Sequence, residues 1–164
     1  LLYGFSHINL IKLYFKIEFM SWVRIWVHLV FSTKNRAPFL HAAIRQKVFQ
    51  HIKQNAEKKD IYLDSVNGWS DHAHCLISLN KNMSMSKTAQ LIKGESSIWI
   101  NQNKLTSDKF IWQDDYWAVS VSERHVPAVR NYIFNQEAHH QKVPFVEEVE
   151  EFMKKYGWQY IQPE

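Results

Sequence analysis

Cysteine, glycine and proline are all scarce in this sequence, and each shortage argues against a particular kind of structure. Cys75 is the only cysteine, so the chain forms no internal disulfide and fits a reducing, cytoplasmic compartment. Four glycines and four prolines in 164 residues argue against long disordered linkers, and the length suits one domain with a real core. The sequence has no glycine-rich phosphate loop, so a nucleotide cofactor is not indicated.

The first nineteen residues, LLYGFSHINLIKLYFKIEF, also lack the features of a membrane span or a signal peptide. Lys12, Lys16 and Glu18 interrupt the apolar run, which is too short and too charged to cross a bilayer. The basic start and the small-residue cleavage site of a signal peptide are missing. Because a clean strand pattern begins after Met20, we expect Met20 to be the natural start and residues 1–19 to be upstream sequence read in frame. An extra strand or arm that packs on the domain is the alternative.

Positive charge is present but unevenly spread. The formal net charge is +4, while the segment from Val143 onward carries five glutamates against Lys154 and Lys155. The preceding part of the chain is therefore the basic part. This balance favours a polyanionic partner, with nucleic acid first, over a solvated surface with a slight excess of lysine.

Hydrophobic periodicity predicts an ordered series of strands and helices. Apolar residues alternate between Trp22 and Thr33, as in a strand, and recur four apart over 41–59, as in a helix. The remaining predicted elements are strands over 61–70 and 72–79 joined at a turn of Asn67 and Gly68, a helix capped by Ser84 or Ser86, a strand over 116–122, and helices over 126–140 and 145–156.

This order of elements predicts the fold class. Strand, helix, strand, strand, helix, strand and further helices are typical of an α+β, ferredoxin-like split βαβ fold, with an antiparallel sheet and helices packed on one face. We expect the domain to span residues 20–158, followed by a short tail at 159–164.

Two histidines stand one residue apart inside a strand pattern, in the stretch SDHAHCLISLN. Side chains alternate along a strand, so His72 and His74 point to one face while Ala73 and Cys75 point to the other. Two imidazoles side by side can hold a metal ion, and Asp71 could orient one ring. Packed or surface histidines are the alternative.

A tyrosine and a glutamine lie four residues apart in the predicted helix over 126–140. Tyr132 and Gln136 therefore share a helix face. Considered without the histidine pair, they are interpreted as a partly buried tyrosine and a solvent-facing glutamine. Together with the histidine pair they suggest a mechanism: the Gln136 oxygen is a third metal ligand, the ion acts on a phosphodiester, and Tyr132 attacks phosphorus to form a covalent phosphotyrosine.

Five segments resemble one known family in order and spacing: STKNRAPFL, DHAHCLISL, LIKGESSIWIN, WQDDYWAVSVS and YIFNQEAHH. They are similar to the single-tyrosine HUH (His, hydrophobic, His) transposases of the insertion-sequence two-hundred-like family, from about Met20 to Lys155. Asp115 and Trp117 depart from the residues common in the family, so we expect loop geometry or DNA contact to differ near the strand over 116–122.

The resemblance implies a DNA transposase that cleaves and rejoins single-stranded DNA at hairpins near element ends, through a 5′-phosphotyrosine. It implies Tyr132 as nucleophile and Mg²⁺ or Mn²⁺ held by His72, His74 and Gln136. It further implies a homodimer, with no membrane association, in a bacterial or archaeal cytoplasm beside the nucleoid. A domesticated, non-cutting binder of hairpin DNA or RNA is the alternative, and an HUH nuclease of replication or conjugation is a third reading.

Several further residues are candidates for contact with nucleic acid or with the ion. Lys34 and Arg36 follow a strand in a basic loop and could meet phosphates, as could Lys93 by the resemblance. Trp112 and Trp117 either stack on unpaired bases or pack internally. The roles of two histidines are left undecided by the sequence. His140 either approaches the ion or complements the dipole at a helix end, and His28 either lines the site or is a core histidine.

Overall fold

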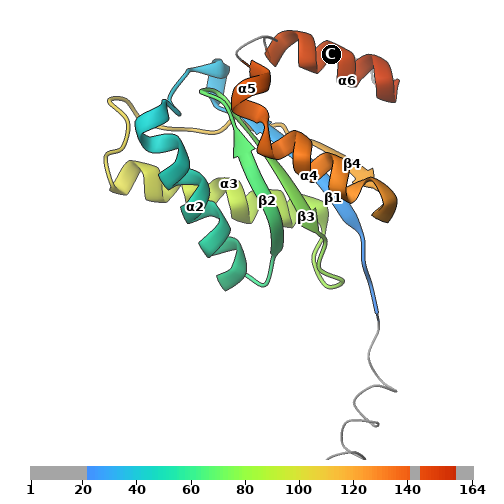
Figure 1. Cartoon of the computed structure of the whole chain (residues 1–164). Helices are drawn as coiled ribbons and strands as arrows, with labels where there is room; N and C mark the ends of the chain where they lie inside the picture. Colours follow the sequence, from blue (N-terminus) through green and yellow to red (C-terminus); the bar gives the residue numbers. More distant parts are fainter. Residues whose placement is uncertain (1–21, 141–144, 158–164) are drawn as a thin grey trace, which may run out of the picture.

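The computed structural model describes residues 22–140 and 145–157 and contains one four-stranded antiparallel sheet in that part of the chain (Figure 1). The predicted extension at 1–19 and the tail at 159–164 lie outside the described residues. The strand order is β2-β3-β1-β4, with bounds β1 Trp26–Ser32, β2 Tyr62–Gly68, β3 His72–Ser78 and β4 Trp117–Val121. This is the arrangement expected of the ferredoxin-like split βαβ fold, so the predicted fold class is confirmed.

The alternating pattern of β1 divides its side chains between two hydrophobic clusters. Val27, Leu29 and Phe31 point into the larger core, while Trp26 belongs to a smaller cluster on the other face. The strand begins four residues later than predicted, because Trp22 and Val23 precede the pairing with β3 and are exposed. Both neighbours of β1 are antiparallel strands, which places it near the middle of the sheet.

Helices α2 (Ala42–Lys58) and α3 (Met85–Gln102) cover the face of the larger core. Val48, Ile52 and Ala56 form the buried stripe of α2 that the four-residue spacing predicts. The N-cap of α3 is Ser84, whose hydroxyl accepts a hydrogen bond from the Lys87 backbone N–H. A 3₁₀ turn, η1 (Lys34–Arg36), lies in the connection between β1 and α2.

Helix α4 (Val126–Phe134) lies on the opposite face of the sheet, so the expectation that the helices share one face holds for α2 and α3 only. Val126 and Ile133 of α4 pack against Trp26 and Leu76 of the sheet. The second 3₁₀ turn, η2 (Glu123–His125), leads from β4 into this helix. The face with the paired histidines is therefore covered by a helix of its own.

The predicted helix over 126–140 is divided in two at Asn135. Helix α4 ends at Phe134, and α5 (Gln136–His140) follows. The Asn135 side-chain amide donates to the Asn131 carbonyl oxygen, which is one way a helix end satisfies its carbonyl groups. Tyr132 and Gln136 thus belong to consecutive helices instead of one continuous face.

The last helix, α6 (Phe145–Tyr156), begins and ends as predicted. Gly157 follows it with a φ of +65°, the left-handed conformation that suits glycine at a helix end. In Figure 1, α6 lies across the end of the α4 side of the sheet.

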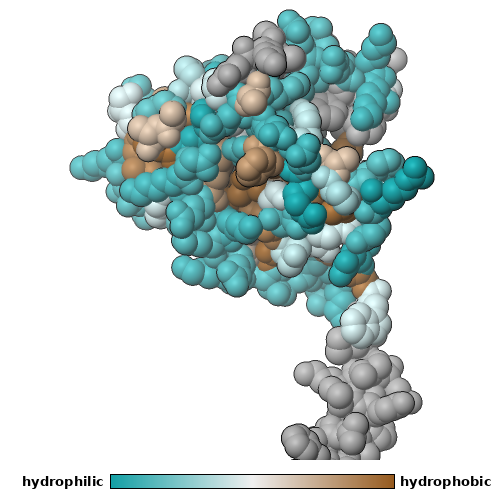
Figure 2. All heavy atoms as spheres, viewed as in Figure 1, coloured by the Kyte–Doolittle hydropathy of each residue, from teal (hydrophilic) through white to brown (hydrophobic). Residues whose placement is uncertain are grey.

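No helix in the described part of the chain has the length and apolarity that a bilayer crossing requires. In Figure 2 the visible face is mostly hydrophilic, with hydrophobic residues gathered between α2 and α4.

Gly68 is the last residue of β2 and pairs with Ala73 of β3, between the two histidines of the predicted site. The turn falls at residues 69–71, not at Asn67 and Gly68, because both of those residues still pair with β3. A Cβ atom on Gly68 would lie 2.2 Å from the His72 carbonyl oxygen. Glycine is therefore required here by the close approach of two backbones, beside the first histidine of the pair.

We expect Gly68→Ala to lower the free energy of unfolding by about 3 kcal/mol, because backbone atoms must shift to admit the methyl group. Urea titration followed by circular dichroism measures this loss. Gly94→Ala is the matched control: a Cβ there meets nothing within 4 Å, and inside α3 it should stabilise by roughly 0.5–1 kcal/mol. A Gly68→Ala protein as stable as the wild type would contradict the close approach.

Candidate active site

The paired histidines lie on one face of β3, as the alternation predicts. His72 and His74 are both fully buried, with ring centroids 5.0 Å apart. The residues between and beyond them, Ala73 and Cys75, belong to the larger core on the opposite face. A rigid strand in the interior of the sheet thus holds two imidazoles in fixed relation.

Each ring of the pair is oriented by a second side chain. The Nδ1 atom of His72 lies 2.8 Å from Oδ1 of Asp71, and Nδ1 of His74 lies 3.1 Å from Nε2 of His28. These contacts engage one nitrogen of each ring and leave Nε2 directed to the other side, as in metal-binding histidines. The orienting role that the sequence suggested for Asp71 thus has the required geometry, and His28 lines the site.

Burial keeps these imidazoles neutral. It lowers the pKa of His72, although the hydrogen bond and charge of Asp71 oppose the change. Burial and the neighbouring imidazoles lower the pKa of His74 further, and burial with the charge of Lys155 lowers the pKa of His28 to about 4. Neutral imidazole is the form that donates a lone pair to a metal ion.

Gln136 opens α5 and is fully buried beside His72. Its amide favours the protonated form of that ring and so raises the His72 pKa against the effect of burial. The amide atoms nevertheless make no hydrogen bond of normal geometry with the described residues. The structure therefore places the Gln136 amide, buried, next to an imidazole of the histidine pair.

Tyr132 lies on α4 beside the histidine pair of its own chain. Its ring centroid is 5.7 Å from that of His74 and 6.1 Å from that of His28. The phenol donates a hydrogen bond to the Glu148 carboxylate of α6. Tyr132 also lines a cleft of about 600 Å³ whose other walls include β4 residues and Lys155, so the phenol has a route to solvent.

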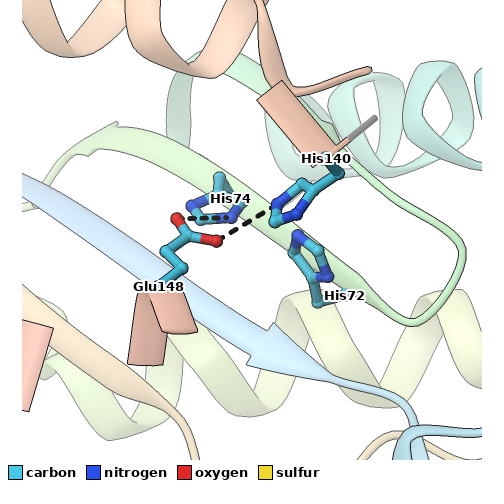
Figure 3. A group of neighbouring side chains, drawn as sticks. All are labelled: His72, His74, His140 and Glu148. Atoms are coloured by element: carbon cyan, nitrogen blue, oxygen red, sulfur yellow. Dashed lines mark ion pairs between the residues drawn. The ribbon is translucent and has the colours of Figure 1, made fainter. Parts of the chain in front are cut away.

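Glu148 is the residue of this site that sequence reasoning missed. Its Oε1 lies 3.6 Å from Nε2 of His74 and its Oε2 lies 3.1 Å from Nε2 of His140 (Figure 3). The sequence contains no signal for it, because Glu147, Glu150 and Glu151 belong to the same acidic run. Burial, with the charges of Glu151 and Asp71, raises the pKa of Glu148 to about 8.

His140, which the sequence left open, joins the same group. Its ring centroid is 4.4 Å from that of His72. One ligand atom from each of His72, His74, His140 and Glu148 lies within 4.8 Å of all the others. The structure therefore favours the reading in which His140 approaches the metal position.

The predicted nucleic-acid residues fall into two groups: Arg36 is near enough to His72 for its charge to lower the pKa of that ring, whereas the two lysines meet at another loop. Lys34 forms an ion pair with Asp114, and Lys93 of α3 donates to the Asp114 and Asp115 carbonyl oxygens. Arg36 lies in η1 with a positive φ of 56°. Lys34 and Lys93 thus meet at one loop, which also carries the departure from the family pattern at Asp115.

The two tryptophans have different environments. Trp112 is buried among Phe31 and Phe110, and its indole N–H donates to the Ser96 hydroxyl. Its ring faces are covered, so the internal-packing alternative is the one that the structure supports. Trp117 is half-buried at the start of β4, opposite Val30 of β1.

The donor set fits a divalent cation. Nε2 of His74 is buried without a hydrogen bond, and ligand atoms of two further imidazoles and a carboxylate lie within 4.8 Å of one another and of the His74 ring nitrogen that completes the group. Nitrogen and oxygen donors of this kind suit Mn²⁺ and Zn²⁺ well and Mg²⁺ through the oxygens. A metal ion can therefore be held at this site.

Asp71→Asn tests whether the orientation of His72 matters. Because the residue supporting a ligand histidine sets its tautomer and basicity, we expect metal affinity to fall by roughly 10–100-fold while the fold is retained. Isothermal titration with Mn²⁺ measures the change. Asp108→Asn, at an exposed position, is the control. An unchanged affinity in Asp71→Asn would rule out the supporting role.

Comparison with known proteins identifies the family of this chain. The sequence pattern of the family described as "Transposase IS200 like" matches residues 21–136, a range that contains the histidine pair, Tyr132 and Gln136. Among curated protein sequences none matches this chain.

Two solved structures share the fold. One is a protein of Deinococcus radiodurans R1 assigned as a transposase, with a TM-score of 0.56 and 19% identity over 71% of this chain and 93% of the other. Another is a REP-associated tyrosine transposase bound to a REP hairpin, with a TM-score of 0.56 and 15% identity over 76% of this chain and 73% of the other. The family match, which covers more than half of the sequence and the whole histidine strand, shows that this chain belongs to the IS200-like transposase family.

Proposed function

We propose that this chain is a metal-dependent enzyme that cleaves and rejoins single-stranded DNA through a covalent 5′-phosphotyrosine at Tyr132. The observation that carries the proposal is the position of the Tyr132 phenol, 5.7 Å between ring centroids from His74 and on the wall of an open cleft. A nucleophile next to a cation site is the arrangement that phosphoryl transfer requires.

In this proposal His72, His74 and Gln136 hold a Mg²⁺ or Mn²⁺ ion. When bound, the ion supplies Lewis-acid stabilisation of charge on the phosphate. Asp71 and His28 keep the two imidazoles in the ligand orientation. Burial of both rings excludes water from the side of the site that faces the sheet.

In this proposal Tyr132 takes over the DNA phosphate and later passes it on to another 3′ hydroxyl. Its phenolic oxygen forms a bond to phosphorus, the bond from phosphorus to the 3′ oxygen breaks, and a free 3′ hydroxyl is released. When another 3′ hydroxyl attacks the phosphotyrosine, the phenolate leaves and the phosphodiester is restored. The bond energy is kept in the protein–DNA linkage, so rejoining needs no ATP.

Hairpin DNA is the proposed substrate. The REP hairpin bound by one structurally similar transposase and the basic character of residues before Val143 support it. Lys34, Arg36, Lys93 and the half-buried Trp117 are the proposed contacts, with phosphates for the cations and an unpaired base for the indole. Homodimerisation belongs to the same proposal, although Tyr132 already stands beside the histidines of its own chain.

A covalent-adduct experiment tests this function. The full chain is incubated with Mn²⁺ or Mg²⁺ and a labelled single-stranded oligonucleotide that carries a hairpin, then run on a denaturing protein gel. We expect a labelled species of the size of protein plus the 3′ part of the DNA, lost when EDTA is added. Binding that persists in EDTA with no adduct on any of a panel of hairpins would instead establish the non-cutting binder.

A further inference from the structure

The four side chains His72, His74, His140 and Glu148, here called the closed cluster, differ from the ligand set of the proposed function. They share the two strand histidines with it, but replace the Gln136 oxygen by an imidazole from the end of α5 and a carboxylate from α6. Strand β3 and the two C-terminal helices α5 and α6, which follow it by more than fifty residues, therefore converge on one point, as Figure 3 shows.

We propose that the closed cluster binds a transition-metal ion of the Zn²⁺ class with four protein ligands, in a resting state that has no open position for a phosphate. The inference shares its two strand histidines with the proposed function, but it does not require that the chain cleaves DNA.

The geometry is that of a small, dry coordination site. One ligand atom from each residue lies within 4.8 Å of the other three. All four side chains are at most 3% exposed. Asp71 and His28 fix the two strand imidazoles from behind. A contraction of about an ångström brings these atoms to the distances at which Zn²⁺ binds nitrogen and oxygen.

Charge in the cluster also favours a cation. A carboxylate in the interior is costly unless it is neutralised, and the contacts of the buried Glu148 side chain are two imidazoles and a phenol. Asp71 and Glu151 add further negative potential at Glu148. A divalent ion coordinated by the carboxylate and three imidazoles would remove this cost.

The donor set selects the type of ion. Three nitrogens and one oxygen in a closed group suit the tetrahedral preference of Zn²⁺, whereas Mg²⁺ demands octahedral oxygen coordination. Four protein ligands are typical of closed sites, while catalytic sites keep a position open. The closed cluster and the set with Gln136 are thus alternative states around the same two histidines.

The closed state would also restrain the nucleophile. The carboxylate of Glu148 that joins the cluster accepts the hydrogen bond of the Tyr132 phenol. A substrate phosphate must therefore displace Glu148 both from the ion and from the phenol. Helix α6, which carries Glu148, would act as the element that separates the resting state from the active one.

Metal binding to the full chain tests the inference, with Zn²⁺ in competition titrations and Co²⁺ as the spectroscopic probe. We expect the strong visible absorption of tetrahedral Co²⁺ in the wild type. Loss of a residue that only supports a metal ligand weakens binding by up to roughly 100-fold. Because Glu148 and His140 are proposed as direct ligands, Glu148→Gln and His140→Gln should each weaken Zn²⁺ binding by at least that factor. The tetrahedral absorption should disappear in both variants.

Two matched variants separate this set of ligands from its alternatives. Glu147→Gln makes the same charge change at the adjacent exposed position of α6 and should leave Zn²⁺ affinity unchanged. Gln136→Met removes the amide oxygen of the other ligand set and should alter Zn²⁺ affinity by no more than a few-fold. Thermal melting of the metal-free variants checks that each is folded.

The results distinguish failure of the inference from failure of the proposed function. Full Zn²⁺ affinity in folded Glu148→Gln and His140→Gln proteins, or octahedral Co²⁺ in the wild type, would overturn the closed cluster, whether or not the DNA adduct forms. Tetrahedral Co²⁺ that depends on Glu148 would support it, even if no hairpin gives an adduct.

Discussion

Tyr132→Phe is expected to abolish the covalent protein–DNA adduct. The substitution removes one oxygen atom, the atom proposed to attack phosphorus, and leaves the ring that contacts both His74 and His28 edge-on. Loss of a nucleophile lowers turnover by on the order of 10³-fold or more. The measurement is the fraction of labelled hairpin DNA that becomes attached to protein, on a denaturing gel, over a series of times.

The matched control for this change is Tyr62→Phe, which removes a hydroxyl at an exposed position on β2. It should form the adduct at the wild-type rate. The phenol of Tyr132 also bonds to Glu148, so metal affinity is measured in both variants to separate loss of the nucleophile from a change in the site. Adduct formation by Tyr132→Phe would show that another residue attacks the DNA.

His72→Ala is expected to abolish metal-dependent cleavage. The ring belongs to both proposed ligand sets, and the strand that carries it lies inside the sheet. A metal ion contributes several kcal/mol to the stabilisation of charge in a transition state, and about 4 kcal/mol corresponds to roughly 10³-fold in rate. Cleavage rates at increasing Mn²⁺ concentration measure the loss.

The control for His72→Ala is His51→Ala on α2. His51 pairs with Glu95 and stacks on the Trp99 ring, on the face of the sheet opposite the site. Its removal costs packing but should leave the metal dependence of cleavage intact. If His72→Ala is folded and still cleaves with the Mn²⁺ response of the wild type, or if wild-type cleavage ignores a chelator, the proposed ligand set is wrong.

Prediction from sequence succeeded where a feature depends on local periodicity. The two-residue period of a strand set His72 and His74 on one face, and the same period assigned Val27, Leu29 and Phe31 to the core. The Ser84 cap and the glycine after α6 follow equally local rules. These requirements act within a few residues, so they can be read without knowledge of the packing.

Prediction was weaker where a feature depends on how elements meet. The break at Asn135, which separates Tyr132 and Gln136 into two helices, has no proline or glycine to signal it. The placement of α4 on the second face depends on the apolar patch of Trp26 and Leu76 against which its own apolar residues pack, and the pattern of the helix alone does not name that face. Trp112 and Trp117 look alike in sequence, and only the fold distinguishes a core indole from a half-buried one.

The sequence by itself determined the sheet, the order of its elements and the pairing of two imidazoles on one strand. Those features follow from side-chain period, which every residue carries with it. The tertiary structure alone decided that His28, His140 and Glu148 meet the pair, because they belong to β1, α5 and α6, which converge only when the helices pack on the second face of the sheet. Glu148 differs from its acidic neighbours in burial, and burial is a property of the packed molecule.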